Sequence, residues 1–212
     1  MTLTRQRVIL AALIAGALVL EVGLLVWLFS DPNGSDDPPK SGRDTGSQIT
    51  GAAGCGGAAP ADRPSGGRVV ATRHFAIEVP QAWDGAVEGE VVTLTKKDGR
   101  ATLSVGRARP GDLAGALEDL RATLRRTYTH LEVTNLEPLL IDGCPGRSIV
   151  GRARNRRAAQ LNFEGVVIEG PFENFVIAGF LERGSEPALD AQVAGLIRSV
   201  RFSPSGGEPA RS

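Results

Sequence analysis

Two histidines, His74 and His130, are the first candidates for acid–base or metal chemistry in this chain. Each alternates with apolar neighbours in a segment expected to be extended, and neither has a second His or a Cys pair at the spacing of a zinc site. Ser148 lies between Arg147 and Ile149 in an expected strand, without the Gly-x-Ser-x-Gly setting of a hydrolase nucleophile. The sequence therefore predicts no catalytic residue, no metal site and no cofactor, and we expect a protein that is not an enzyme.

Four arginines crowd the tip of an expected hairpin: Arg152, Arg154, Arg156 and Arg157. Arg152 and Arg154 are two residues apart and should project from the same face of their strand. Because guanidinium groups bind phosphate through two hydrogen bonds, one interpretation is an anion site for a phosphate-bearing envelope polymer or a lipid headgroup. The alternative is a solubilising hairpin whose charges discourage edge-to-edge strand pairing.

Charge over the whole chain is balanced, with 24 Lys plus Arg against 24 Asp plus Glu. Residues 68–202 hold 18 basic and 17 acidic residues, a net charge of +1. No overall field of one sign would attract nucleic acid, so we expect no nucleic-acid partner. Glu88 and Glu90 can share one strand face, but exposed strand carboxylates are usually only solvated.

The two cysteines, Cys55 and Cys144, are far apart in the sequence. A bridge between them would close a long loop and contribute roughly 4 to 5 kcal/mol in the loop-entropy description. Free or intermolecular thiols are the alternative. Cys55 follows small residues as a lipidated cysteine would, but about 25 residues separate it from the nearest apolar run, so this match is interpreted as accidental.

Residues 8–29 form an apolar run of 22 residues in which only Glu21 is charged. At about 1.5 Å per residue, a helix of this length covers roughly 33 Å, which is enough to cross a bilayer. Arg5 and Arg7 precede the run and acidic residues follow it, which predicts a cytoplasmic N-terminus and an extracytoplasmic remainder. A cleaved secretory signal is the alternative, but the run exceeds the usual apolar core of roughly 7 to 15 residues and lacks a small-x-small cleavage site.

Glu21 has two interpretations. With Ala12 and Gly16, which form a small-xxx-small pair, it could belong to a helix face that pairs with a protein partner in the membrane. Alternatively, it is protonated or reaches toward the headgroups.

Composition divides the chain into five parts. A short cytoplasmic N-terminus (1–7) precedes the membrane helix (8–29). Residues 30–67 are rich in Gly, Ser, Pro and Asp and are expected to form a disordered linker, as is the tail at 203–212. Residues 68–202 hold the alternating and helical patterns of one folded domain.

Within that domain, the apolar periodicity predicts two helices and a run of strands. Strands are expected at 75–79, 91–97, 101–109, 136–141, 148–154, 158–169 and 174–182, with a turn at 142–146. One helix is expected at 113–126 after the N-cap Asp112. A second is expected with Ser185 as its N-cap and Pro187 in its first turn. This order predicts an α+β domain with a central antiparallel sheet flanked by helices.

Several short motifs occur in order along residues 68–202: Phe75-x-Ile77-x-Val79-Pro80-x-x-Trp83, a hairpin, a Leu-rich helix, Asp142-Gly143-x-Pro145-Gly146, a meander, and a last helix that ends in Ser199-Val200-Arg201-Phe202. Together they resemble PsbP-like domains, including bacterial envelope lipoproteins of the LpqN type. The resemblance implies an α/β/α sandwich and a non-catalytic binding or accessory role, with no shared catalytic set. A membrane helix here replaces the lipidated cysteine of the lipoprotein members. We therefore expect a single-pass membrane protein that presents this domain outside the cell, with a protein partner or an anionic envelope ligand.

Overall fold

The computed structural model describes Cys55 and residues 68–203. The expected membrane helix and the residues Ala12, Gly16 and Glu21 lie outside the described residues. None of the described helices has the length and apolar character needed to cross a bilayer.

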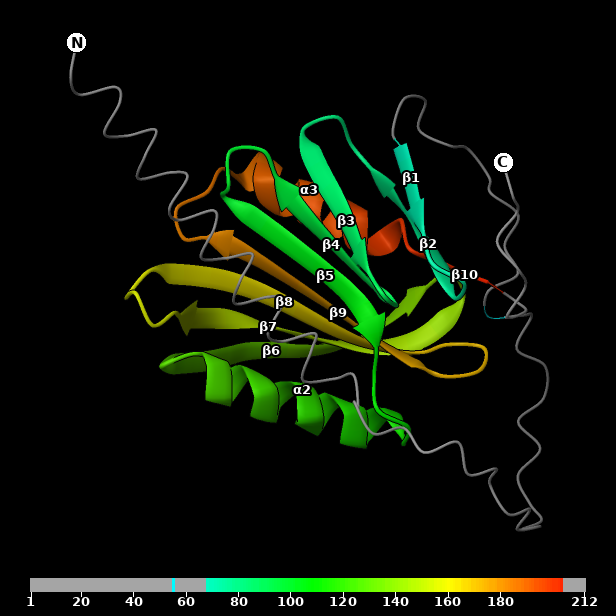
Figure 1. Ribbon diagram of the computed structural model, residues 1–212. Coiled ribbons are helices and arrows are strands. Elements are labelled where there is room, and N and C mark those ends of the chain that lie inside the picture. The colour runs from blue at the N-terminus through cyan, green and yellow to red at the C-terminus, as the bar shows by residue number, and fades with distance from the viewer. Residues whose placement is uncertain (1–54, 56–67, 204–212) are drawn as a thin grey trace.

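The described part folds into two helices and two antiparallel sheets (Figure 1). The elements in chain order are β1 (Arg68–Ala71), β2 (Phe75–Val79), β3 (Trp83–Glu88), β4 (Val91–Lys96), β5 (Ala101–Arg107), α2 (Leu113–Thr127), β6 (His130–Ile141), β7 (Cys144–Arg154), β8 (Gln160–Glu169), β9 (Asn174–Glu182), α3 (Pro187–Arg198) and β10 (Arg201–Phe202). The large sheet has the order β3-β4-β5-β9-β8-β7-β6, and the small sheet has the order β1-β2-β10.

The large sheet separates two cores (Figure 1). On one face, α2 packs across β6 to β9, and Leu120 lies so close to Gly165 that a Cβ there would stand 2.9 Å from a Leu120 methyl carbon. On the other face, α3 and the small sheet cover the β5 and β9 side, and Val193 of α3 lies equally close to Gly179. The missing side chains of these glycines let both helices lie near the strand backbones.

The expectation of a mainly antiparallel sheet with two helices is confirmed, but one face differs from a simple α/β/α sandwich. The small sheet shares that face with α3, because β2 buries Phe75, Ile77 and Val79 against the large sheet. The second core therefore has strands as well as a helix above the sheet.

Two local predictions were wrong. The N-cap of α3 is Glu186 and not Ser185, whose hydroxyl donates a 2.5 Å hydrogen bond to the carbonyl of Glu182 instead. The turn expected at 142–146 is a two-residue turn of Asp142 and Gly143, with φ angles of 52° and 75°. Pairs of positive φ angles suit the twist of a tight hairpin, so β7 already begins at Cys144.

The Asp142 turn lies where the β6–β7 hairpin, β10 and Cys55 meet. Its carboxylate Oδ2 accepts a 2.8 Å hydrogen bond from the Phe202 amide, which fixes β10 beside the hairpin. Cys144, the first residue of β7, forms a disulfide with Cys55. The cysteines are 89 residues apart in the sequence, and Cys144 is fully buried. The bridge ties a residue N-terminal to the domain to one end of the large sheet.

Candidate functional site

The pairing of β7 with its neighbours places basic side chains beside one another. Arg154 lies opposite His130 of β6 and Gln160 of β8, and Arg152 lies opposite Glu132 of β6. Because Arg152 and Arg154 are two residues apart, they project from the same face, as the sequence predicted. These residues line an open hollow of about 420 Å³ at the end of the sheet.

Arg183, which follows β9, adds a third guanidinium to this hollow. Its Nη1 donates a hydrogen bond to the side-chain oxygen of Gln160, and its backbone amide bonds to the Gln160 carbonyl at 2.9 Å. Three guanidinium groups thus lie near a single carboxylate, that of Glu132. Neither Arg152 nor Arg154 forms an ion pair with another described residue, so both cations are available to a ligand. We call this site the arginine hollow.

Arg156 and Arg157 lie in the β7–β8 connection, outside the lining of the arginine hollow. The Asn155 side chain holds this connection, because its Oδ1 accepts hydrogen bonds from the amides of Arg157 and Ala159 at 3.0 Å and 2.9 Å. Of the four arginines predicted from the sequence, the structure therefore brings two into a common site. Arg183 was missed because it is 29 residues from Arg154 in the sequence, and only the pairing of β8 with β9 brings it close.

A second hollow of about 420 Å³ adjoins the first at Arg152 and extends to α3. Its lining includes Glu164 of β8 and Asp190 of α3. Burial raises the pKa of Glu164 above its usual value, and the positive charge of Arg198 offsets only part of this effect. The lining of the two hollows therefore changes from basic at the arginine hollow to acidic near α3. An anion is favoured at the arginine end.

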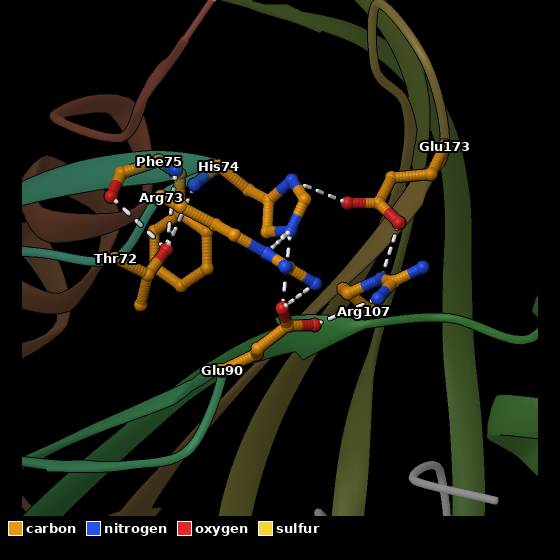
Figure 2. Close-up of polar contacts among 7 residues, drawn as sticks. All are labelled: Thr72, Arg73, His74, Phe75, Glu90, Arg107 and Glu173. Carbon is orange, nitrogen blue, oxygen red and sulfur yellow. Dashed lines mark hydrogen bonds and ion pairs between the residues drawn. The ribbon is translucent and has the colours of Figure 1, made fainter. Parts of the chain in front are cut away.

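A compact charge cluster lies elsewhere in the domain, beside the small sheet (Figure 2). His74 is at its centre, with Nδ1 2.9 Å from Glu173 Oε1 and Nε2 3.2 Å from Glu90 Oε1. Arg107 bridges the same carboxylates, 2.7 Å from Glu90 Oε2 and in contact with Glu173 Oε2. Arg73 also pairs with Glu90.

The cluster changes the acidity of its members. Burial alone would raise the pKa of Glu90, but the hydrogen bond and charge of Arg107, with those of His74 and Arg73, hold that pKa below its usual value. Burial would likewise lower the pKa of Arg107, yet its pairing with Glu90 and Glu173 raises it. The cations of the chain thus favour the ionised form of Glu90.

This arrangement indicates a structural role for the charge cluster. It joins the β1–β2 connection, the β3–β4 turn, the end of β5 and the β8–β9 loop, which are far apart in sequence. The ring nitrogens of His74 contact Glu90, Glu173 and Arg73, and no hydroxyl or thiol of the described residues is hydrogen-bonded to the ring as an activated nucleophile would be. In the described residues, no three His, Cys, Asp or Glu side chains gather as metal ligands would.

The sequence interpretation of these residues was wrong in two respects. His74 lies in a bend before β2, not in a strand. Glu90, expected to be merely solvated, contacts three cationic or ring-nitrogen partners. No local motif could reveal the cluster, because its members extend from Arg73 to Glu173.

The sequence matches no protein-family model and no curated protein. Solved structures similar to the domain include a cyanobacterial PsbP (CyanoP) from Synechocystis sp. PCC 6803, with a TM-score of 0.49 and 12% identity, over 67% of this chain and 97% of that one. LpqN, described as involved in cell envelope biogenesis of Mycobacterium tuberculosis, matches with a TM-score of 0.39 and 13% identity, over 66% and 87% of the two chains.

The Saccharomyces cerevisiae Ran-binding protein Mog1p is also similar, with a TM-score of 0.42 and 14% identity, over 60% of this chain and 89% of Mog1p. The PsbP and LpqN groups named in the sequence analysis are thus both among the structures that the domain resembles. Likenesses of this size assign no function to this chain.

Proposed function

We propose that this chain is a non-catalytic, single-pass membrane protein of a bacterial cell envelope, whose extracytoplasmic domain acts as a binding or accessory subunit of an envelope complex. The apolar run at 8–29, with Arg5 and Arg7 before it, supports the anchor and its orientation. The bridge between Cys55 and Cys144 supports the compartment, because disulfides persist outside the reducing cytoplasm.

The arginine hollow carries the proposal of an anionic ligand. Arg152, Arg154 and Arg183 project into one open volume with no ion pair to Glu132. Guanidinium groups present pairs of parallel N–H donors, which match phosphate oxygens better than an ammonium group does. His130 opposite Arg154 adds a ring that can donate a further hydrogen bond. A phosphate-bearing polymer or a phospholipid headgroup would supply the matching oxygens.

The test uses the full chain in vesicles of neutral phosphatidylcholine with fluorescent inorganic polyphosphate as the probe. We expect the polyphosphate to sediment with the vesicles, and to be released as salt screens the contacts. The triple variant Arg152→Ser, Arg154→Ser and Arg183→Ser should weaken binding by about tenfold or more, since each charged hydrogen bond contributes on the order of 1 kcal/mol or more. The matched control changes three exposed arginines elsewhere, Arg109→Ser, Arg125→Ser and Arg126→Ser.

A second arm separates the two sources of phosphate. The full chain in vesicles that contain phosphatidylglycerol is treated with phenylglyoxal. Mass spectrometry then measures the modification of Arg152, Arg154 and Arg183. If phosphatidylglycerol alone protects these arginines from modification, the ligand is the lipid headgroup. If only added polyphosphate protects them, the ligand is a soluble polymer. Equal loss of binding in the triple variant and its control would refute the arginine hollow as the site.

A further inference from the structure

We propose that the end of the domain that carries the disulfide rests on the membrane surface, with Phe172 and Leu140 inserted among the lipid headgroups. The proposal depends on the membrane anchorage proposed above. It deepens that proposal by assigning the domain one orientation and a contact surface with lipid.

Phe172 and Leu140 are the most exposed large apolar side chains of the described residues, each with 71% of its surface accessible. Strand pairing places them at the same end of the large sheet. Leu140 of β6 lies opposite Pro145 of β7, and Phe172 lies in the loop that joins β8 to β9 after the last pair, Glu169 and Asn174. Both therefore project near the ends of neighbouring strands, where water contacts them.

The same end holds the covalent connection to the N-terminal part of the chain. Cys144 begins β7 next to the Asp142 turn, and the Cys55 sulfur lies 3.5 Å from the backbone oxygen of Glu169. The tether thus enters the domain within the end that exposes Phe172 and Leu140.

The length of chain before Cys55 sets how far this end can move from the anchor. Residues 30–54 connect the apolar run to Cys55, a distance of 25 residues. A flexible coil of that length spans on the order of 25 to 30 Å. With the proposed anchor, the bridged end would therefore lie nearer the bilayer than the rest of the domain.

The chemistry of this end suits a lipid interface. Phe and Leu side chains gain free energy when they enter the boundary between headgroups and acyl chains. Arg147 is exposed and lies opposite Pro138 on β6, two residues along the strands from the pair of Leu140 and Pro145. Its guanidinium can reach phosphate groups while its apolar stem lies along the surface. Glu169 would remain at the aqueous level of the headgroups.

The orientation also constrains the arginine hollow. β6 begins at His130, which lines the hollow, and ends at Ile141, beside the disulfide. Eleven steps of about 3.3 Å make this distance roughly 35 Å. The hollow would face away from the bilayer, which favours a polymer in the aqueous envelope over a headgroup of the same membrane.

The test labels lipid contacts in the full chain. The protein is placed in phosphatidylcholine and phosphatidylglycerol vesicles that contain a photoactivatable lipid with its diazirine near the headgroup. After illumination, reduction and trypsin digestion, mass spectrometry measures the label on three peptides, residues 8–40, 127–147 and 158–183, which hold the apolar run, Leu140 and Phe172. The test variant is Leu140→Ser with Phe172→Ser, and the control is Val69→Ser with Val87→Ser, which removes exposed apolar side chains on β1 and β3.

We expect all three peptides to be labelled. The test variant should lose about fivefold or more of the label on 127–147 and 158–183, because partial burial of two apolar side chains supports the contact. The label on 8–40 should be unchanged in the test variant, and the control should match the native chain. If 8–40 is labelled while the other two peptides carry no more label than peptide 108–121, the anchor stands and this orientation is refuted. An unlabelled 8–40 would refute the anchor itself, and with it both proposals.

Discussion

Glu164 shows how a single residue of the site affects the whole domain. Its carboxylate lines the hollow beside α3, where burial raises its pKa and Arg198 offsets part of the effect. A carboxyl group with a folded-state pKa above its unfolded value stabilises the folded state at low pH. That stability is lost as pH rises from the unfolded pKa through the folded one. At neutral pH, ionised Glu164 therefore costs the protein some stability.

The variant Glu164→Gln should consequently be more stable than the native domain at pH 7. We expect a rise in Tm of about 2 °C at pH 7 that shrinks as the pH approaches 4, where native Glu164 is protonated. Thermal unfolding followed by circular dichroism at several pH values measures this. Glu88→Gln, an exposed carboxylate on β3, serves as the matched control. A Tm at pH 7 equal to or below the native value would show that the attraction of the Arg198 charge outweighs burial.

The residues of the arginine hollow were partly predictable. Arg152 and Arg154 are close in sequence, and strand alternation alone places them on one face. Arg183 joins them only because β9 pairs with β8, so no local pattern reveals its role. His74 and Glu90 were missed for the same reason, since 16 residues and a change of sheet separate them.

Among the elements, the predictable ones have strong internal periodicity. α2, β4, β5 and β9 were expected within about two residues of their observed ends, because each has a regular apolar pattern. β1, β3 and β10 were not expected as strands. They are short or largely exposed, and β10 forms only by pairing with a strand far away in the sequence. Such strands depend on their partners more than on their own residues.

The charge cluster joins elements whose connection the sequence does not specify, and its contribution should depend on pH. The pKa of Glu90 is lowered in the folded state, so its contribution is fully present above the unfolded pKa of about 4.3 and is lost as pH falls through the folded value. Glu90→Gln should therefore lower the free energy of unfolding by about 1 kcal/mol at pH 7, a modest value because the side chain is partly exposed. The difference should disappear once the pH is low enough to protonate Glu90 in the folded state.

Urea denaturation of the Glu90→Gln variant and the native chain at pH 7, 5 and 3 measures this difference. Glu88→Gln, two residues earlier and exposed, should leave the free energy of unfolding unchanged at each pH. A loss for Glu90→Gln that is the same at pH 3 as at pH 7 would mean that the side chain acts through its shape and not through its charge.

At the scale of the whole molecule, the two proposals assign different roles to opposite ends of the domain. The arginine hollow lies at the start of β6, and the apolar residues and the disulfide lie near its other end. The helices occupy opposite faces of the sheet and leave both ends free (Figure 1). A domain of this shape can contact a membrane at one end and present a ligand site at the other, which an anchored binding module requires.

The disulfide links this architecture to stability. It closes a loop between residues 89 apart, for which the loop-entropy description gives about 4 to 5 kcal/mol as an upper value. Reduction of the native chain should therefore lower the free energy of unfolding by about 2 to 4 kcal/mol, measured by urea denaturation with and without dithiothreitol. The variant Cys55→Ala should match the reduced native chain and should be insensitive to dithiothreitol, which makes it the control for effects of the reductant.

Reduction also releases the tether from the end that exposes Phe172, so the lipid label on residues 158–183 should fall while the label on 8–40 is retained. Two reactive thiols in the denatured, unreduced chain would contradict the bridge and remove this support for the orientation.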